Sequence, residues 1–158
     1  MYRIEVTKEY LGFAAAHFIT MKGKCERLHG HNYQTWFEVE GELTDDGYVF
    51  DFTELKQIAK ALCATLDHRV LLATENPKIS IHADNDSVYA TYENQRYMFP
   101  ADDVALLPIR NTTAELLATY LARQLAQHLR GQSSHNARAI GVWVAEGPGQ
   151  RAYCRQEL

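Results

Sequence analysis

The N-terminal part of the chain alternates between apolar and polar side chains with a period of two, which is typical of half-buried β-strands. Residues 2–20 begin with this alternation and run into the segment Phe13-Ala-Ala-Ala-His17-Phe-Ile. Residues 31–42 alternate again, and the polar segment 21–30 between them carries basic side chains. The pattern predicts one long or bent strand, a loop and a second strand.

Two later segments have apolar residues at helical spacing, and each follows a capping signal. Asp51-Phe-Thr-Glu54 places an N-cap side chain three residues before a glutamate, and the helix that it begins should end before Asp67. Thr112-x-x-Glu115 is a second capping box. The two predicted helices have apolar faces formed by Leu55, Ile58, Ala59 and Leu62, and by Leu116, Leu117, Tyr120, Leu121, Leu125 and Leu129.

The remaining apolar runs are short and predict strands. Residues 79–81 and 87–92 resemble short strands. The turn-like sequence Glu93-Asn-Gln-Arg joins residues 87–92 to residues 97–99, which indicates a β-hairpin inserted near residues 79–107.

The C-terminal segment has the same character. Residues 139–145 and 151–157 predict two strands joined by a turn at Gly147-Pro-Gly149, and residues 131–136 predict a loop before them. The order is strand, strand, helix, hairpin, helix, strand, strand. We therefore predict an α+β fold in a single domain, residues 1–158.

Composition and charge exclude several classes of protein. Apolar residues make up 46% of the chain and charged residues 23%, with a net charge of −4 and interspersed signs. Nothing in this distribution favours nucleic acid or a membrane as a partner, and no apolar run approaches the length of a membrane span. The three cysteines, Cys25, Cys63 and Cys154, lack a disulfide-framework spacing. We therefore expect reduced thiols in a cytoplasmic protein.

The histidines suggest a metal site. His29-Gly-His31 places two imidazoles on one face of an extended chain, and His17 on the neighbouring predicted strand can supply a third nitrogen. Three protein ligands with an open fourth position are the pattern of catalytic zinc. The alternative is that this pair occurs by chance. A further alternative is that Cys25 is a fourth ligand, which would give a closed structural site.

Other titratable residues suggest proton transfer and ligand binding. Cys25 lies in a cationic loop, where a depressed thiol pKa is expected. Asp67 precedes His68 and can fix its tautomer as part of a proton relay, although a turn cap and a surface histidine are the simpler alternative. Glu146, at the end of a strand, can be merely solvated. It can also accept paired hydrogen bonds from a heterocycle with an amino group beside a ring N–H.

Several motifs occur in a fixed order and cover most of the chain apart from about residues 77–106. They are Phe13-Ala-Ala-Ala-His17, Cys25-Glu-Arg-Leu-His29-Gly-His31-Asn-Tyr33, Asp51-Phe52, Leu66-Asp-His68, Asn111-Thr-Thr-Ala-Glu115 and Val-Ala-Glu146. Together they resemble the signature of the pyruvoyl-tetrahydropterin synthase family. The resemblance implies the tunnelling fold, a four-stranded antiparallel sheet with two helices on one face. It also implies trimers that close into a barrel and pair into hexamers, with active sites between subunits.

Position by position, the resemblance implies roles for the candidate residues. The zinc ligands would be His17, His29 and His31. The proton-transferring residues would be Cys25, Asp67 and His68, and the substrate-binding residues would be Glu146, Thr113 and Glu26. The substrate class would be 7,8-dihydroneopterin triphosphate.

The product depends on finer features. Three residues separate Cys25 from His29, which resembles the carboxy-tetrahydropterin branch that serves queuosine synthesis. Glu26 follows Cys25 directly, and this pair resembles a subgroup of the family that has both the cysteine and the glutamate. Members of that subgroup also release 6-hydroxymethyl-dihydropterin for folate synthesis. We therefore predict a 6-carboxy-tetrahydropterin synthase. The alternatives are a 6-pyruvoyl-tetrahydropterin or hydroxymethyl-dihydropterin synthase, a non-catalytic pterin-binding paralogue, and a structural zinc module.

Overall fold

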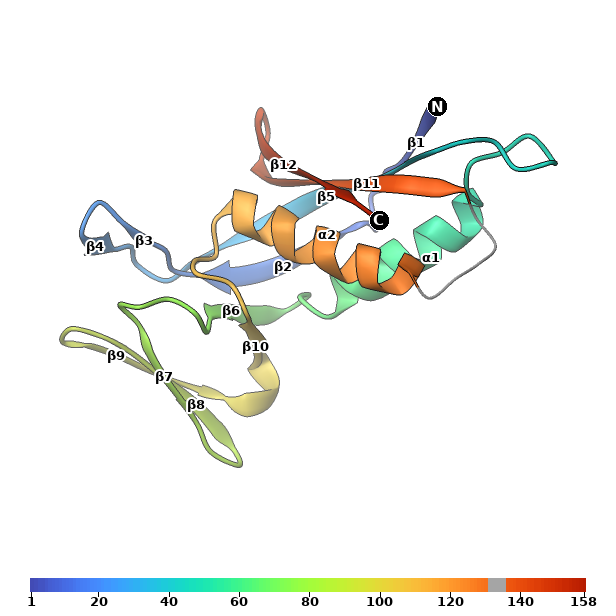
Figure 1. The fold of residues 1–158 in the computed structure, drawn as a ribbon. Helices are drawn as coiled ribbons and strands as arrows, with labels where there is room; N and C mark the ends of the chain where they lie inside the picture. The colour runs from blue at the N-terminus through green and yellow to red at the C-terminus, as the bar shows by residue number, and fades with distance from the viewer. Residues whose placement is uncertain (131–135) are drawn as a thin grey trace.

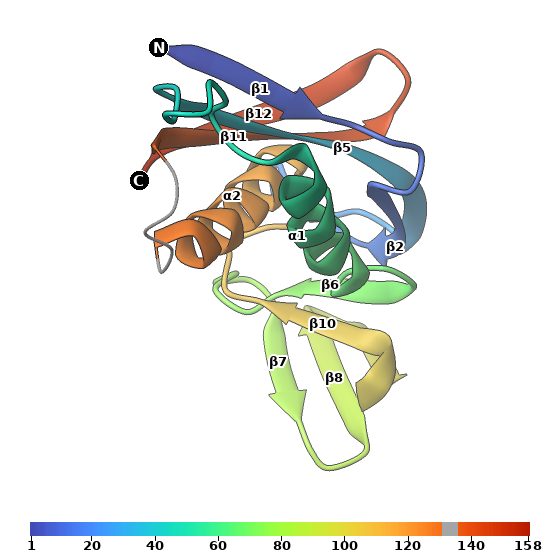
Figure 2. The ribbon, with the colours of Figure 1, turned by 90° about the vertical axis from the view of Figure 1, so that its right-hand side faces the viewer.

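The computed structural model describes residues 1–130 and 136–158. A large sheet curves around two helices, and a smaller sheet extends from one end of the molecule (Figures 1 and 2). The predicted α+β class with two helices is confirmed. Within the described residues, no helix is long and apolar enough to cross a membrane.

The N-terminal alternation forms two strands along one long partner. Both β1 (Tyr2–Val6) and β2 (Gly12–His17) pair antiparallel with β5 (His29–Gly41), one after the other. The predicted long or bent strand over residues 2–20 is therefore interrupted at residues 7–11. There Leu11 is fully buried, and its carbonyl accepts hydrogen bonds from both the backbone N–H and the hydroxyl of Thr35.

The C-terminal hairpin matches its prediction. β11 (Ala137–Gly147) pairs with β5, and β12 (Gln150–Glu157) pairs with β11. The turn between them contains Gly149 at a φ of +80°, a conformation that favours glycine. The predicted loop at residues 131–136 lies, except for Asn136, outside the described residues.

The main sheet is larger than the predicted four-stranded antiparallel sheet. Among the described residues it has seven strands. The predicted N-terminal strand forms two strands, β1 and β2, and β6 (Arg69–Ala73) and β10 (Val104–Leu107) extend the sheet beyond β2. The β2–β6 and β6–β10 pairs are parallel. Both added strands are short runs without polar alternation, so a period of two could not reveal them.

The helices cover one face of this sheet. In α1 (Phe52–Ala64) the Asp51 carboxylate accepts a hydrogen bond from the Thr53 N–H at 2.6 Å, and the helix ends before Asp67, as predicted. For α2 (Ala114–Arg130) the predicted Thr112 cap was wrong. The Thr112 hydroxyl donates instead to the Phe18 carbonyl at 3.3 Å. The Thr112 side chain therefore makes a tertiary hydrogen bond instead of capping the helix.

The core lies between the sheet and the helices. Leu117, Leu121 and Leu125 of α2 are fully buried against sheet residues that include Phe37 and Ile140. Burying such side chains contributes about 1.5–3 kcal/mol each relative to exposure. This core fixes the position of α2 and therefore of the segment that precedes it.

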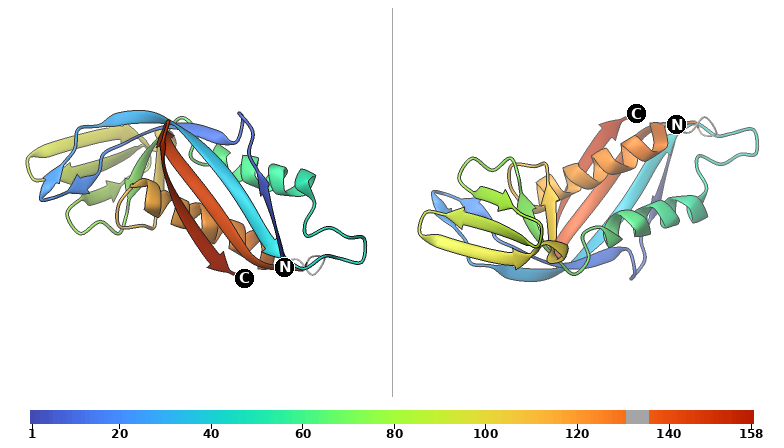
Figure 3. Two further views of the ribbon diagram at one scale, coloured as in Figure 1. Left: turned by 90° about the horizontal axis from the view of Figure 1, so that it is seen from above. Right: turned by 90° about the horizontal axis from the view of Figure 1, so that it is seen from below.

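The inserted segment is a three-stranded antiparallel sheet that contains the predicted hairpin. It consists of β7 (Ser80–Ala83), β8 (Ser87–Tyr92) and β9 (Gln95–Pro100). A 3-10 turn, Ala101–Asp103, leads from it to β10. We call residues 80–100 the insert. The insert lies at the same end of the molecule as a short hairpin of β3 (Thr20–Met21) and β4 (Lys24–Cys25) (Figures 1 and 3).

Candidate metal centre and adjoining cavities

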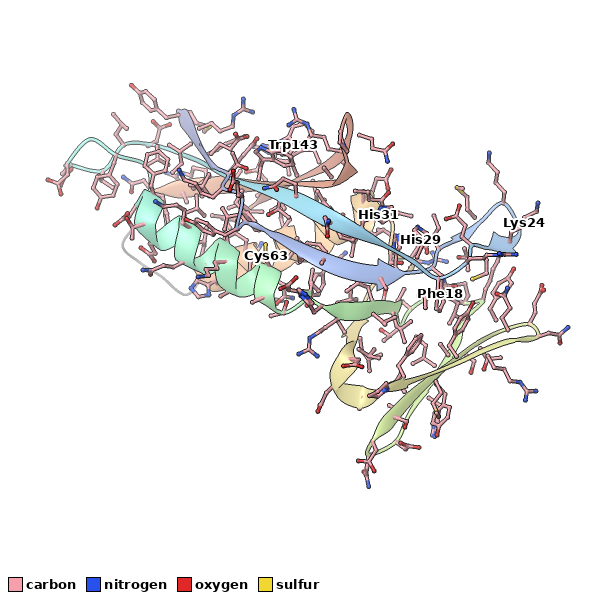
Figure 4. All side chains as sticks on the ribbon, turned by 180° about the vertical axis from the view of Figure 1, so that it is seen from behind. Phe18, Lys24, His29, His31, Cys63 and Trp143 are labelled. Atoms are coloured by element: carbon pink, nitrogen blue, oxygen red, sulfur yellow. The ribbon has the colours of Figure 1, made fainter. Side chains whose placement is uncertain are left out.

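Three histidine side chains converge where β2 and β5 pair. His17, the last residue of β2, lies opposite His29, the first residue of β5. His31 follows on the same face of β5, because successive side chains of a strand alternate. Figure 4 shows His29 and His31 near one another on this strand. One nitrogen from each of the three imidazoles lies within 4.8 Å of the others. The structure thus brings together the three predicted ligands.

Backbone carbonyls orient two of these imidazoles. Nδ1 of His17 lies 2.9 Å from the Thr112 carbonyl oxygen, and Nδ1 of His29 lies 2.7 Å from the Arg27 carbonyl oxygen. A carbonyl only accepts hydrogen bonds, so we assign the proton to Nδ1 in both rings. Each Nε2 then keeps its lone pair, as a metal ligand requires.

Electrostatics also keeps His17 neutral. Its pKa is lowered to about 4, mainly because its side chain is buried and also because of the other two histidines, whereas the hydrogen bond to Thr112 acts in the opposite direction. A neutral imidazole needs no deprotonation before it binds a cation. Three imidazole nitrogen donors suit zinc with an open position. Cys25 is not among the residues of this cluster.

Sequence reasoning missed two groups beside the histidines. The Tyr33 hydroxyl is buried 3.2 Å from Nδ1 and 3.4 Å from Nε2 of His17, and burial followed by the charge of Glu146 raises the pKa of Tyr33. The alternation that groups His29 with His31 extends to Tyr33 and could have found it. Thr112 acts through its backbone, so its residue type gave no signal.

Asp67 and His68 form a hydrogen-bonded pair directly after α1. An Asp67 oxygen lies 3.0 Å from Nδ1 of His68, and the other accepts the Ala14 N–H at 2.8 Å. The hydrogen bond from Ala14 is the main cause of the lowered Asp67 pKa, and His68 contributes. His68 adopts a φ of +56° and points into solvent, with 83% of its side chain exposed. With His31 it lines a cavity of about 520 Å³.

Cys25 lies elsewhere. It is half-buried on β4 and lines a separate hollow of about 290 Å³ with residues of the insert, including Tyr92. Burial and then the charge of Glu26 raise its pKa, so the expected lowering was wrong. The exposed cations of this loop are solvated, whereas the thiol packs against apolar side chains.

The predicted substrate-binding residues divide between two places. Glu146 and Thr113 line one cavity of about 320 Å³ at the start of α2, together with Arg151. Besides burial, the charge of Glu146 raises the pKa of Tyr33, which places Glu146 close to the histidines. Glu26 is half-buried beside Cys25, and its backbone N–H donates to the Ile19 carbonyl at 2.9 Å.

Comparisons with known proteins agree with this arrangement. A model of the 6-pyruvoyl tetrahydropterin synthase family matches residues 5–157. A curated protein of Methanocaldococcus jannaschii with the provisional name 6-carboxy-5,6,7,8-tetrahydropterin synthase is 37% identical over 149 residues, 94% of this chain and 91% of that protein. The dihydroneopterin monophosphate aldolase of Pyrococcus furiosus is 42% identical over 59 residues, which cover 37% of this chain and 50% of that protein.

The fold also matches solved structures. The crystal structure of 6-pyruvoyl tetrahydropterin synthase from Plasmodium vivax superposes with a TM-score of 0.92 at 32% identity, covering 99% of this chain and 98% of that one. Another structure of the P. vivax protein, with the same values, is of a catalytic-residue mutant in which alanine replaces a glutamate.

Proposed function

Because the chain belongs to the 6-pyruvoyl tetrahydropterin synthase family, we propose that it is a zinc-dependent lyase that converts 7,8-dihydroneopterin triphosphate to 6-carboxy-5,6,7,8-tetrahydropterin. The observation that carries this proposal is the three-histidine cluster with the Glu146 cavity beside it. The product fits the names of relatives such as the M. jannaschii protein. Such a product would serve queuosine or related deazapurine synthesis.

Different residues of the chain would bind the metal, bind the substrate and transfer protons in this reaction. His17, His29 and His31 would hold zinc, which when bound polarises the side-chain hydroxyls of the substrate and acidifies the adjoining C–H. The Glu146 carboxylate accepts hydrogen bonds from the amino group and the ring N–H of the pterin, and Thr113 lies beside Glu146. Cys25 and the Asp67–His68 pair carry protons to and from the side chain of the substrate. Triphosphate is released with the uptake of one water, and a carbon–carbon bond of the side chain breaks. The remaining two side-chain carbons leave as acetaldehyde, and the first carbon is oxidised to the carboxylate while the dihydropterin ring is reduced to the tetrahydro level.

Product identification tests this proposal. Purified protein would be incubated with 7,8-dihydroneopterin triphosphate and the products identified by mass spectrometry. We expect 6-carboxy-tetrahydropterin. A pterin that retains the full three-carbon side chain would contradict the proposed product, and unchanged substrate would contradict the proposed enzyme.

Glu26 favours a second candidate, release of 6-hydroxymethyl-dihydropterin. Glu26 is half-buried next to Cys25, and a glutamate is named as a catalytic residue in the P. vivax relative. The P. furiosus relative is named as an aldolase that acts on a dihydroneopterin phosphate. The same product analysis distinguishes this candidate, because its product keeps one side-chain carbon as an alcohol.

Replacing Glu146 with glutamine should weaken substrate binding without altering the metal content. The carboxylate accepts two charge-assisted hydrogen bonds, each worth about 1.5–3 kcal/mol, whereas the amide nitrogen would face a donor. We expect the substrate Kd to rise at least about tenfold, measured by titration. Glu115→Gln is the control, because Glu115 lies at the same cavity in the first turn of α2. An unchanged Kd in Glu146→Gln would refute this role.

Assembly provides another test, because Cys25 and His68 line different cavities of one chain. We propose a hexamer of paired trimers with the tunnelling fold, in which Asp67 and His68 serve the Cys25 of a neighbouring subunit. Edge strands such as β12 leave backbone groups that pairing with another copy would satisfy.

Mixing two inactive variants tests this arrangement. Random co-assembly of equal amounts of Cys25→Ala and His68→Ala subunits leaves about a quarter of the sites with both native residues if the sites are shared. We therefore expect about a quarter of wild-type activity after co-refolding. Refolded mixtures without activity, or a fully active monomer in sedimentation, would contradict shared sites.

A further inference from the structure

The hairpin that carries Cys25 is too short to be stable on its own. Its strands contribute two residues each, paired as Thr20 with Cys25 and Met21 with Lys24. The connecting Lys22 and Gly23 both have positive φ values, 51° and 75°. Isolated two-stranded hairpins are at best marginally stable in water, so contacts from elsewhere must hold this one.

The root of the hairpin is fixed by two asparagines. The Asn111 side chain donates to the Thr20 carbonyl at 2.8 Å, and the Asn76 side chain donates to the Thr20 hydroxyl at 3.0 Å. These bonds act at the first residue of β3. They leave the turn to be fixed by other groups.

The insert supplies a contact at the turn. The hydroxyl of Tyr92, the last residue of β8, donates to the Gly23 carbonyl at 3.3 Å. The Tyr92 side chain belongs to a buried cluster of insert and sheet residues against which Cys25 packs. Tyr92 therefore contacts the hairpin through its hydroxyl and is itself held by its buried ring.

A second contact joins the insert to the histidine cluster. Tyr97 of β9 stacks on Phe18, with ring centroids 4.8 Å apart and planes inclined by 19°. Phe18 directly follows His17. Figure 4 places Phe18 between His29 and the insert. The insert thus contacts both the hairpin that carries Cys25 and the residue that follows His17.

We propose that Tyr92 is a positioning residue that holds the β3–β4 hairpin, and with it the Cys25 thiol, in place for proton transfer. The inference rests on the proposed function for its catalytic consequence, whereas the bracing of the hairpin is a property of the fold. On this proposal the insert stabilises the β3–β4 hairpin, which is too short to be stable on its own.

The test combines thiol reactivity with kinetics in the zinc-loaded, full-length protein. A Cys154→Ser background leaves Cys25 as the one cysteine that is not buried. The variants are Tyr92→Phe, which removes the hydroxyl alone, and Tyr92→Ala. Tyr89→Phe is the matched control, because Tyr89 lies on the same strand but on its other face and is 36% exposed.

In Tyr92→Phe we expect iodoacetamide to alkylate Cys25 about two to ten times faster, the range that corresponds to one lost hydrogen bond. We expect kcat to fall by a similar factor while KM and zinc content stay unchanged. Tyr89→Phe should match the background in every measurement. Cys63, which is buried in the core, should stay unmodified in both phenylalanine variants, because neither unfolds the protein.

Two results would overturn the inference. One is a Cys25 alkylation rate and kcat in Tyr92→Phe equal to those of Tyr89→Phe. The other is faster alkylation only in Tyr92→Ala and at Cys63 as well as Cys25, since this would show general destabilisation. Alkylation needs no turnover. An absence of pterin product in the background protein would therefore refute the proposed function while the bracing of the hairpin is still decided by the alkylation rates.

Discussion

The His31→Ala variant is expected to lose both its metal and its activity while keeping its fold. His31 contributes one of three converging nitrogens, and two remaining imidazoles leave too few ligands for a stable zinc site. Because the loss of an outer-shell partner alone costs about 10–100-fold in metal affinity, the loss of a ligand should cost more. Metal analysis of the purified variant measures this directly.

A second histidine provides the control. His128 lies exposed on α2, outside the cluster, so His128→Ala should keep one zinc per chain and full activity. Circular dichroism of both variants would establish that the fold is retained. Full zinc occupancy in His31→Ala would refute the proposed ligand set.

The Cys25→Ala variant is expected to lose about 10²–10⁴-fold in kcat, the contribution of a positioned proton-transfer group. Its zinc content should not change, because Cys25 is not among the converging ligands. The raised pKa of Cys25 means that the thiol is protonated at neutral pH, so we expect it to donate a proton. Stopped-flow or discontinuous product assays measure kcat, with Cys154→Ala as the control.

Glu26→Gln decides between the two neighbouring residues. If Cys25 transfers the proton, Glu26→Gln should retain most of kcat. A loss of activity in Glu26→Gln with an active Cys25→Ala variant would transfer the role to Glu26 and favour the hydroxymethyl product. Loss of zinc together with the fold in Cys25→Ala would instead support a closed structural site.

The sequence predicted the parts of the site that depend on local periodicity. Strand alternation places His29 and His31 on one face, and the pairing of β2 with β5 adds His17. The Asp51 cap likewise depends on neighbouring residues only. These features follow from a few residues and the geometry of one element or of two strands that are close in the sequence.

The features that the sequence did not predict depend on contacts between distant segments. Cys25 lines a hollow with Tyr92 and packs against the apolar cluster to which Tyr92 belongs, and the Thr112 hydroxyl donates to the Phe18 carbonyl instead of capping α2. The parallel strands β6 and β10 are buried runs of a few residues, which resemble any short apolar segment. Such contacts form only when the whole chain folds, so no local pattern encodes them.

Dependence of turnover on zinc tests the central claim most directly. The purified protein would be stripped with a chelator, assayed with 7,8-dihydroneopterin triphosphate, reloaded with one equivalent of zinc and assayed again. We predict that turnover to 6-carboxy-tetrahydropterin disappears on stripping and returns on reloading, and that His31→Ala does not recover. Undiminished turnover by the stripped protein would contradict a metal-dependent pterin synthase at the three-histidine centre.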